Sequence, residues 1–562
     1  MKEVSMTAPS GVRPAEAGRS AFTRRTLVKG AAWAAPVTAF SVGAPAMALS
    51  PSCSDGALLN SQARARMLSG QIGGLDLDTL AEVNGVHARA FDPAADGATG
   101  GTVEDLQANP LTVEALSALR LDLGGLSNVL LTNILDFTTG QDAGVLNEYA
   151  YANEEALSGN SSAAPEVGGA GAVSNDGTIA FSVDDPNPPA LGTIDLYSLL
   201  QQATGDGVAE LVDLIAGLNL EIGAAAGLAE LDYACETDVG LAVEDVDRDY
   251  LIAYLKLVVE SNLAGSLLQG ISNGLEGADL GISTSELLGA LEGIPVLGPL
   301  IAGIGNAVAS ADIGLTVNTD QLLTAPIPDD PNAALRVDPT ASEITLDLAA
   351  LLGGAYTGAI SRFLNELGPN MRLFTDVGLP AGGVTAVLDS WVDSLLTRLL
   401  SVATVNLTLT VASIVRVQVN GTVADLLSGE GTATVQNWLP LVGWRDLAGV
   451  PLGDVLKAVG GVVSGAIEGL FNAEGGVLRG SLDSLNGLLS VLFRVLEGVL
   501  AITVNAQNSA NGGTIPTYYG SIAPAGRYDV AALHLELLGV AGLLDLSIAR
   551  GSVGENSYRT ES

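Results

Sequence analysis

The chain has 562 residues and a formal net charge of −39, because 63 Asp and Glu outnumber 24 Lys and Arg. Nucleic acids and anionic membranes are bound through clustered cations, so this balance argues against both kinds of partner. Apolar residues make up 48% of the chain, whereas aromatic residues make up only 4%. We therefore expect a folded protein whose core is built from Leu, Val, Ile and Ala.

The first 48 residues differ from the rest, because they hold six cations and only two anions. Residues 30–48 are uncharged and end in Ala46-Met47-Ala48, a small-residue cleavage pattern. A cationic segment, an apolar segment and such a site together predict an export signal that is cleaved after Ala48. Prolines interrupt the apolar run, which is also shorter than the roughly 20 apolar residues that span a bilayer.

Arg24 and Arg25 refine this prediction. In the stretch TRRTLVK the arginine pair is followed by apolar residues and a lysine, which resembles the twin-arginine export signal of bacteria. Thr23 before the pair, and Leu-Val where Phe-Leu is commoner, depart from the pattern. The alternative is an ordinary secretory signal. Both routes predict an extracellular or cell-surface protein, with no transmembrane anchor after the signal is removed.

Cys53 and Cys235 are the two cysteines of the chain. Outside the cell such a pair most simply forms a disulfide, which ties the mature N-terminus to a distant point of the chain. A loop of this length contributes about 5 kcal/mol to stability in the chain-entropy model. Two free thiols, or a lipid on Cys53, are the alternatives, although the residues before Cys53 do not resemble a lipobox.

Helix-like and strand-like segments are interleaved along the chain. Amphipathic helices are predicted near residues 208–217, 249–259, 285–309, 357–367, 384–401, 453–470 and 482–499. Alternating apolar and polar residues predict strands at 178–183, 313–318, 344–348, 405–411, 415–420, 501–505 and 543–549. Gly, Pro and small polar residues predict loops at 90–110, 158–176 and 507–527. The predicted fold class is α+β, with antiparallel, twisted β-sheets in a sandwich-like arrangement and packed amphipathic helices.

A short pattern recurs at irregular intervals. It consists of an apolar, a polar and an apolar residue, two variable residues and then Leu, and it occurs at residues 75–80, 111–116, 194–199, 346–351 and 528–533. Alternation that ends in an anchoring Leu predicts a strand that leads into a corner or a short helix. The irregular spacing argues against a solenoid of fixed repeat.

Candidates for nucleophilic catalysis are scarce. His87 and His534 are the only histidines, so few side chains are available as a general base. Residues 270–274, GISNG, fit the pattern of a hydrolase nucleophile elbow centred on Ser272, but they follow a predicted helix rather than a strand. Carboxylate pairs for glycoside hydrolysis are numerous. Sugar sites are usually lined with aromatic residues, however, and the three Trp after residue 48 are more simply core or rim residues.

A calcium site is the second candidate. Asp245, Asp247 and Asp249 resemble the first half of a calcium-binding loop, but Tyr250 and Lys256 occupy the positions that require Gly and Glu. Acidic residues at the start of a helix that begins near Asp249 explain the cluster better. Calcium therefore remains only a loosely bound candidate, and no other cofactor is predicted. Transition-metal clusters are not expected, because His and Cys are so few.

Several segments resemble one family. They are ARARMLSG at 63–70, GGLDLDTLAEVNGV at 73–86, NPLTVEAL at 109–116 and SVG at 552–554. Together they resemble the actinobacterial choice-of-anchor G family. The resemblance implies an exported surface protein whose shared region is followed by differing attachment devices, and it implies no catalytic residue. This chain lacks an L-P-x-T-G sorting signal after that region, so we expect release or non-covalent retention.

The predicted organisation is an export signal at 1–48, an extracellular region at 49–555 and a frayed tail at 556–562. Candidate sub-units of the extracellular region are 49–240, 241–400 and 401–555.

The predicted function is that of a secreted or cell-surface structural or adhesin-like protein, without catalysis, whose partner is a cell-envelope component or another surface protein. A secreted hydrolase that uses carboxylates is the first alternative, and a calcium-dependent adhesin is the second. A deep pocket of convergent carboxylates near His87 or His534 would favour the hydrolase. A cage of oxygen ligands would favour the adhesin.

Overall fold

A computed structural model describes most of the chain after residue 56. The described residues are 57–80, 85–90, 104–110, 120–123, 126–130, 133–137, 146–153, 165–185, 188–236, 241–276, 281–304, 309–318, 321–322, 324–354, 356–379, 383–472, 477–508, 527–538, 543–554 and 556–560. Residues Leu49–Ser562 cluster as one compact unit. Antiparallel sheets with helices packed on them confirm the predicted α+β class.

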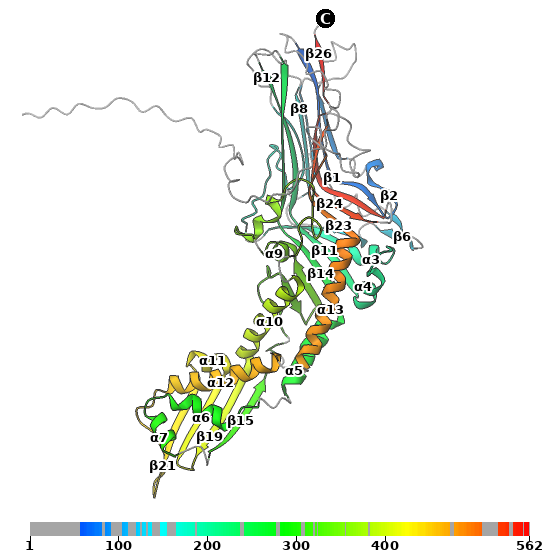
Figure 1. The fold of residues 1–562 in the computed structure, drawn as a ribbon. Helices are drawn as coiled ribbons and strands as arrows, with labels where there is room; N and C mark the ends of the chain where they lie inside the picture. Colours follow the sequence, from blue (N-terminus) through cyan, green and yellow to red (C-terminus); the bar gives the residue numbers. More distant parts are fainter. Residues whose placement is uncertain are drawn as a thin grey trace, which may run out of the picture. The chain divides into compact units, whose positions relative to one another are not determined.

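Two antiparallel sheets pack face to face as a sandwich (Figure 1). The first sheet consists of β18 (Met371–Arg372), β23 (Leu500–Gln507), β24 (Tyr528–Leu537), β25 (Leu544–Val553), β1 (Ala57–Ile72), β2 (Leu75–Asp76), β3 (Val86–Ala90) and β26 (Ser557–Thr560). The second sheet consists of β13 (Leu241–Ile252), β12 (Ala225–Glu236), β9 (Glu166–Gly171), β8 (Asn147–Asn153) and β4 (Glu104–Pro110). Across the sandwich, β1 and β25 contact β8, β9 and β12. The first sheet therefore joins strands from both ends of the described chain.

Glycine lets these two sheets approach unusually closely. A Cβ added to Gly227 in β12 would lie 2.1 Å from the backbone oxygen of Ala549 in β25. A Cβ on Gly551 in β25 would lie 2.1 Å from the backbone oxygen of Gly168 in β9. Stacked sheets normally lie about 10 Å apart, with side chains between them. Here backbone meets backbone at these positions, which only a residue without a side chain allows.

A third sheet holds two copies of the recurring sequence pattern. Its strands are β16 (Leu335–Asp338), β17 (Glu343–Asp347), β14 (Leu255–Glu260), β11 (Gly217–Gly223), β10 (Ala190–Asp195) and β7 (Leu135–Phe137). Strand β10 leads into α3 (Leu196–Leu200), and β17 leads into α9 (Leu348–Leu352). Asp195 and Asp347 end these strands, and their carboxylates accept hydrogen bonds from the backbone N–H groups of Ser198 and Ala350. The polar residue of the pattern is thus a helix N-cap.

The other copies of the pattern behave in two ways. Asp76 caps the short 3-10 helix η1 (Leu77–Thr79) in the same manner. Residues 528–533 instead continue as strand β24, where Asp529 binds arginine side chains. Residues 111–116 lie outside the described residues. The prediction of a strand that leads into a short helix is therefore confirmed for residues 75–80, 194–199 and 346–351, and wrong for 528–533.

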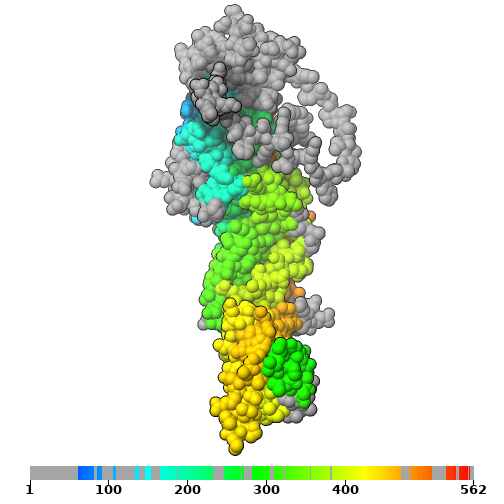
Figure 2. Space-filling view, turned by 90° about the vertical axis from the view of Figure 1, so that its left-hand side faces the viewer, coloured from blue at the N-terminus to red at the C-terminus, as the bar shows by residue number. Residues whose placement is uncertain are grey.

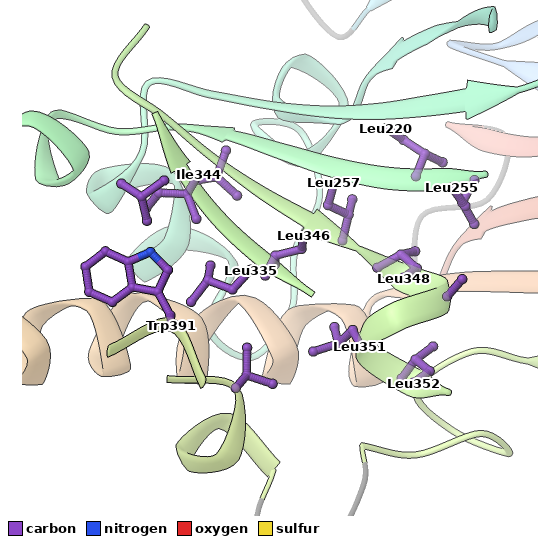
Figure 3. Close-up of a cluster of buried hydrophobic side chains, with 14 of the residues drawn as sticks. Leu220, Leu255, Leu257, Leu335, Ile344, Leu346, Leu348, Leu351, Leu352 and Trp391 are labelled. Carbon is purple, nitrogen blue, oxygen red and sulfur yellow. The ribbon is translucent and has the colours of Figure 1, made fainter. Parts of the chain in front are cut away.

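The core beneath the third sheet is aliphatic, with one tryptophan (Figure 3). Leu220, Leu257 and Leu346 lie on neighbouring strands and are fully buried. Trp391, from α10 (Gly383–Val402), is 1% exposed and donates a hydrogen bond from Nε1 to the backbone oxygen of Ile327 at 3.0 Å. Because the indole N–H is hydrogen-bonded to Ile327, the large Trp391 side chain is buried without an unpaired donor.

In the part of the chain that the structure describes, helices cover one side of a fourth sheet. Its strands are β15 (Ala309–Val317), β19 (Ala403–Val411), β20 (Val415–Thr422), β21 (Thr432–Leu439) and β22 (Gly443–Asp446). Helices that contact it are α5 (Asn262–Glu276), α6 (Thr284–Glu292), α10, α11 (Val423–Ser428) and α12 (Leu452–Asn472). Further elements are α4 (Val208–Leu214), α7 (Leu297–Ile304), α13 (Val477–Gly498) and the hairpin of β5 (Arg120–Leu123) and β6 (Leu126–Leu130).

Three predicted elements take a different form. Residues 249–259 form the end of β13 and most of β14 rather than a helix, because apolar residues spaced for a helix face also fit two short buried strands. Residues 357–367 form only the 3-10 turns η5 (Ile360–Arg362) and η6 (Leu364–Glu366). Within 178–183, Ile179 makes an isolated bridge with Val173 instead of a strand.

Two predicted loops and the predicted tail contain strands. Strand β4 lies within 90–110, and β9, with the sequence EVGGAG, lies within 158–176. The glycines of β9 suggested a loop, but their role is the close approach of the two sheets. The third predicted loop, 507–527, lies almost wholly outside the described residues. The tail was predicted to be frayed, whereas Ser557–Thr560 form β26, which pairs with Ala57–Asn60.

Gly227→Ala tests the close approach of the sheets. The new methyl group would meet the backbone oxygen of Ala549, which cannot rotate away, so we expect a loss of about 3 kcal/mol in the free energy of unfolding. Gly461→Ala is the matched control, since Gly461 is exposed in α12 and has no heavy atom within 4 Å of its added Cβ. Urea unfolding of both variants measures the difference. Equal stability of the two variants would contradict the proposed packing.

Candidate functional site

The uncovered side of the fourth sheet is a continuous polar surface, which we call the polar face. Along each strand the residues that point away from the helices are exposed or half-buried, and they are mostly hydroxyl and amide side chains. The polar face comprises Ser310, Asp312, Gly314, Thr316, Thr404, Asn406, Thr408, Thr410, Arg416, Gln418, Asn420, Thr432, Thr434, Gln436, Trp438, Trp444 and Asp446. The yellow segment that holds β19–β21 reaches the molecular surface on the side shown in Figure 2.

Strand register places four of these side chains in one row. Asp312 pairs with Thr408, Thr408 with Gln418, and Gln418 with Thr434. Within the described residues, none of these four side chains makes a hydrogen bond to the protein. They line a shallow hollow of about 420 Å³, together with Asn406, Asn420 and Thr432. The row therefore presents free donors and acceptors to solvent.

Two tryptophans stand at one end of the polar face. Trp438 and Trp444 are paired across β21 and β22, with ring centroids 5.5 Å apart in an edge-to-face arrangement. The guanidinium of Arg416 lies over the Trp444 ring, 4.1 Å from its centroid. This contact fixes Trp444, and Trp444 in turn supports Trp438. Trp438 remains 46% exposed, four residues along β21 from Thr434 and outside the hollow, so the polar face also carries a fixed aromatic surface.

The loop between β21 and β22 exposes aliphatic side chains. Leu439, Leu441 and Val442 are 41%, 106% and 53% exposed, and Ile414 from the neighbouring β19–β20 turn is 48% exposed. We call these four residues the apolar tip. Single exposed aliphatic residues are common on protein surfaces, but a contiguous group of them typically marks a contact surface.

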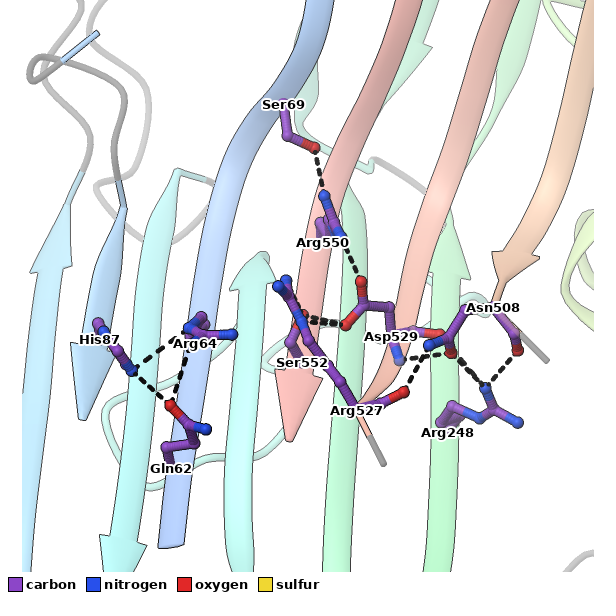
Figure 4. A network of polar contacts seen from close by, with 10 residues as sticks. All are labelled: Gln62, Arg64, Ser69, His87, Arg248, Asn508, Arg527, Asp529, Arg550 and Ser552. Carbon is purple, nitrogen blue, oxygen red and sulfur yellow. Dashed lines mark hydrogen bonds and ion pairs between the residues drawn. The ribbon is translucent and has the colours of Figure 1, made fainter. Parts of the chain in front are cut away.

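A buried ionic network lies within the sandwich (Figure 4). Asp529 is fully buried, and its carboxylate binds Arg550, accepts a hydrogen bond from Arg527 Nε at 2.8 Å and accepts another from Ser552 Oγ at 2.6 Å. Burial alone would raise the pKa of Asp529, but the two guanidinium groups and these hydrogen bonds hold that pKa below its usual value.

The same network reaches the second sheet. Arg248 in β13 donates to both the backbone and side-chain oxygens of Asn508, at 3.0 and 3.2 Å. Asn508 Oδ1 in turn accepts from the backbone N–H of Asp529 at 2.8 Å. Through Arg248 and Asn508, the network therefore links the second sheet to Asp529 in the first.

Glu148 in β8 is a second buried acid that joins the two sheets. It is 2% exposed, and its Oε1 accepts a hydrogen bond from the backbone N–H of Met67 in β1 at 2.8 Å. Burial raises the pKa of Glu148 to about 7, although the Met67 hydrogen bond and the charge of Arg66 oppose the rise. The folded state therefore favours the protonated carboxyl group below neutral pH.

The two histidines do not line the hollow of the polar face. His534 is 1% exposed, its Nδ1 lies 2.9 Å from Ser547 Oγ and its Nε2 lies 3.6 Å from Asp545 Oδ1. Burial and the charge of Arg550 lower the pKa of His534 to about 3. In this trio the serine hydroxyl is itself buried, so it is poorly placed for attack on an external substrate.

His87 in β3 occupies a different environment. It is exposed, and its Nε2 contacts Gln62 and Arg64. Partial burial, followed by the charges of Arg64 and Arg89, lowers the pKa of His87 to about 4. His87 is therefore neutral at physiological pH. Its partners are an amide and a guanidinium rather than a nucleophile, which describes a surface contact between strands rather than a catalytic pair.

The other predicted catalytic and metal-binding candidates lie in regular structure. Ser272 falls within α5, so the strand-to-helix elbow that its motif requires is not formed there. Asp245, Asp247 and Asp249 lie in β13, an extended strand rather than a calcium loop. In the described part of the chain, no group of three or more His, Cys, Asp or Glu is arranged to hold a metal ion.

Of the residues assigned to the export signal and to the disulfide, the structure describes only Cys235. Arg24, Arg25, Ala46, Ala48 and Cys53 lie outside the described residues. Cys235 lies near the end of β12, opposite Ala242 of β13. The disulfide between Cys53 and Cys235 therefore stays a prediction. None of the helices in the described ranges has the length and apolar content needed to cross a membrane.

Sequence patterns alone did not single out the polar face. The alternation in residues 405–411 and 415–420 predicted the strands correctly, and it also implied that one side of each strand is polar. Residues 432–439 and 443–446 were not predicted as strands, so Trp438 and Trp444 were treated only as core or rim residues. A run of Thr, Asn and Gln on successive strands was the available signal.

The architecture defines an α+β protein of stacked antiparallel sheets, with one exposed polar sheet face. The chain belongs to the family described as Domain of unknown function (DUF8394), whose model matches residues 63–554. Neither the curated proteins nor the solved structures provide a significant match to the chain.

Glu148→Gln tests the buried acid. In the native chain, Glu148 is deprotonated in the unfolded state above about pH 4.5 but stays protonated in the folded state up to about pH 7, so stability falls across this window. The accumulated loss is about 3 kcal/mol. The glutamine variant cannot ionise and still accepts from Met67, so its unfolding free energy at pH 8 should exceed that of the native chain, with little difference at pH 4.5.

Urea unfolding at pH 4.5, 6 and 8 measures this effect. Glu292→Gln, at an exposed position of α6, is the control, and it should follow the native chain at every pH. If the free energies of unfolding of Glu148→Gln and the native chain change with pH in the same way, burial does not raise the pKa of Glu148.

Proposed function

We propose that the protein is exported and acts without catalysis at the cell surface or outside the cell, as a structural or adhesin-like component. The proposal of export is supported by the cationic start of the chain, by Arg24 and Arg25, and by the cleavage pattern that ends at Ala48. The resemblance to the choice-of-anchor G family points the same way. The partner would be a cell-envelope component or another surface protein.

The apolar tip is the structural observation that supports action by contact. Ile414, Leu439, Leu441 and Val442 expose aliphatic surface although the chain carries abundant charged residues that could occupy such positions. Water contact with these side chains is unfavourable, and covering them with a partner removes that cost. We infer that the tip makes a non-covalent contact that retains the protein in the cell envelope.

Arg24→Lys combined with Arg25→Lys tests the route of export. The twin-arginine pathway is expected to require both guanidinium groups, so the double variant should accumulate inside the cell with its first 48 residues attached. The native chain should be recovered from the envelope or the medium with Leu49 as its first residue. Cell fractionation followed by mass spectrometry of the chain ends, and of the peptides that contain Cys53 and Cys235, measures both points.

Arg13→Lys combined with Arg19→Lys is the matched control, because these arginines lie in the same cationic segment but outside the pair. Continued export of the Arg24/Arg25 variant would indicate the general secretory route. Native protein found intact in the cytosol, with both cysteines reduced, would contradict the proposal of export altogether.

Leu441→Asp combined with Val442→Asp tests retention by the apolar tip. Both side chains are exposed, so the folded state should keep its stability, while two carboxylates should oppose insertion into an apolar partner site. We expect the variant to move from the envelope fraction to the medium. Leu106→Asp, at an exposed position of β4, is the control and should remain with the envelope. An unchanged distribution of the tip variant would exclude this role of the tip.

A further inference from the structure

We propose that the polar face of the fourth sheet binds an uncharged polysaccharide, which crosses strands β15, β19, β20 and β21 in the hollow and continues along β21 to Trp438. This inference rests on the proposed function, because such a polymer would be met outside the cell. It concerns a different surface from the apolar tip. The test of polysaccharide binding can therefore fail while the proposed role of the tip stands, and the reverse.

The row of unpaired polar groups is the first support. Asp312, Thr408, Gln418 and Thr434 occupy one register row on four adjacent strands, and neighbouring strands lie about 4.8 Å apart. Hydroxyl and amide groups both donate and accept hydrogen bonds, as sugar hydroxyl groups do. A polymer that crosses the strands could therefore meet a new hydrogen-bonding group at each strand, within the hollow of about 420 Å³.

The charge of the polar face favours a neutral ligand. The chain carries 63 acidic residues, but the row and its neighbours in the hollow contain one carboxylate, Asp312, among hydroxyl and amide groups. An anionic polymer would need clustered cations, and Arg416 is already engaged over Trp444. A protein partner would be expected to need an apolar centre in the contact, whereas the exposed side chains at the hollow, such as Asp312, Gln418 and Thr434, are polar.

Trp438 supplies the apolar part of the contact. One side of a pyranose ring presents C–H groups, which pack against an aromatic surface while the hydroxyl groups remain free for hydrogen bonds. Trp438 is 46% exposed and is held by its edge-to-face contact with Trp444. Its position is therefore fixed before the ligand arrives, which lowers the entropic cost of binding.

Affinity gel electrophoresis of the purified full chain tests this inference. The probes are gels that contain neutral β-glucan, mannan, xylan or galactan, with polygalacturonate as the anionic comparison. We expect at least one neutral polymer to retard the native chain. Gln418→Ala combined with Thr434→Ala, and separately Trp438→Ala, should weaken binding by about tenfold, because each removes direct contacts to the polymer.

Two controls keep the result specific. Gln107→Ala changes an exposed glutamine of β4 and should bind like the native chain, as should Leu441→Asp at the apolar tip. Thermal unfolding checks that all variants remain folded.

Three results would overturn the inference: no retardation by any neutral polymer, retardation by polygalacturonate alone, or unchanged binding by the polar-face variants. Sedimentation velocity tests a fourth result that would overturn it. If the native chain self-associates and Gln418→Ala/Thr434→Ala does not, the polar face binds a second copy of the chain instead of a polysaccharide.

Discussion

The close approach of the two sandwich sheets is the constraint on which the rest of the structure depends. At Gly168, Gly227 and Gly551 the backbones of β9, β12 and β25 come so near to each other that no Cβ fits between them. Strands in such contact leave room only for small neighbours, and Ala63, Ala65, Ala150, Ala226 and Ala549 are fully or almost fully buried in this region. The small residues of β9 and β12, with the sequences EVGGAG and AAGLAELDYACE, suit this packing.

The small residues at this contact bury less apolar surface than large aliphatic side chains would, and polar interactions add to the stability of its geometry. Asp529 with Arg527 and Arg550 supplies one of them, and the hydrogen bond from Met67 to Glu148 supplies another. Removing one partner of a buried ion pair typically costs about 3–5 kcal/mol, because the other charge is left uncompensated. The Asp529 cluster therefore holds β24 and β25 together within the first sheet, whereas Arg248 and Glu148 make hydrogen bonds from the second sheet to the first.

The fourth sheet differs from the sandwich because only one of its sides packs against other described elements, which leaves the other side available for binding. Its inner side is apolar and covered by helices such as α11 and α12, whereas its outer side is polar and uncovered. One side therefore holds the sheet in place, and the other side is free to carry residues that stability does not require. Thr408, Gln418 and Thr434 are residues of this kind, since they make no hydrogen bond to the described protein and could be replaced without opening the core.

Several elements were predictable because their signal is local. Alternation in 405–411 and 415–420 fixed β19 and β20, and the polar residue of the recurring pattern became the N-cap at Asp195 and Asp347. Residues 249–259 misled the prediction, because a helical spacing of apolar residues also fits two buried strands. The glycines in β9 also led to a wrong prediction, because glycines in a sequence usually indicate a turn. Their actual role, the close approach of the second sheet to the first, is visible only once both sheets are known.

By itself, then, the sequence determined the acidic charge, the cationic start of the chain, the α+β class and most helices of the second half. Only the tertiary structure decided that β1 lies between β25 and β3, that Asp529 meets Arg550, and that Asp312, Thr408, Gln418 and Thr434 form one row across four strands. The reason is physical. Propensity and periodicity act between residues close in sequence, whereas pairing across hundreds of residues depends on which buried faces fit together.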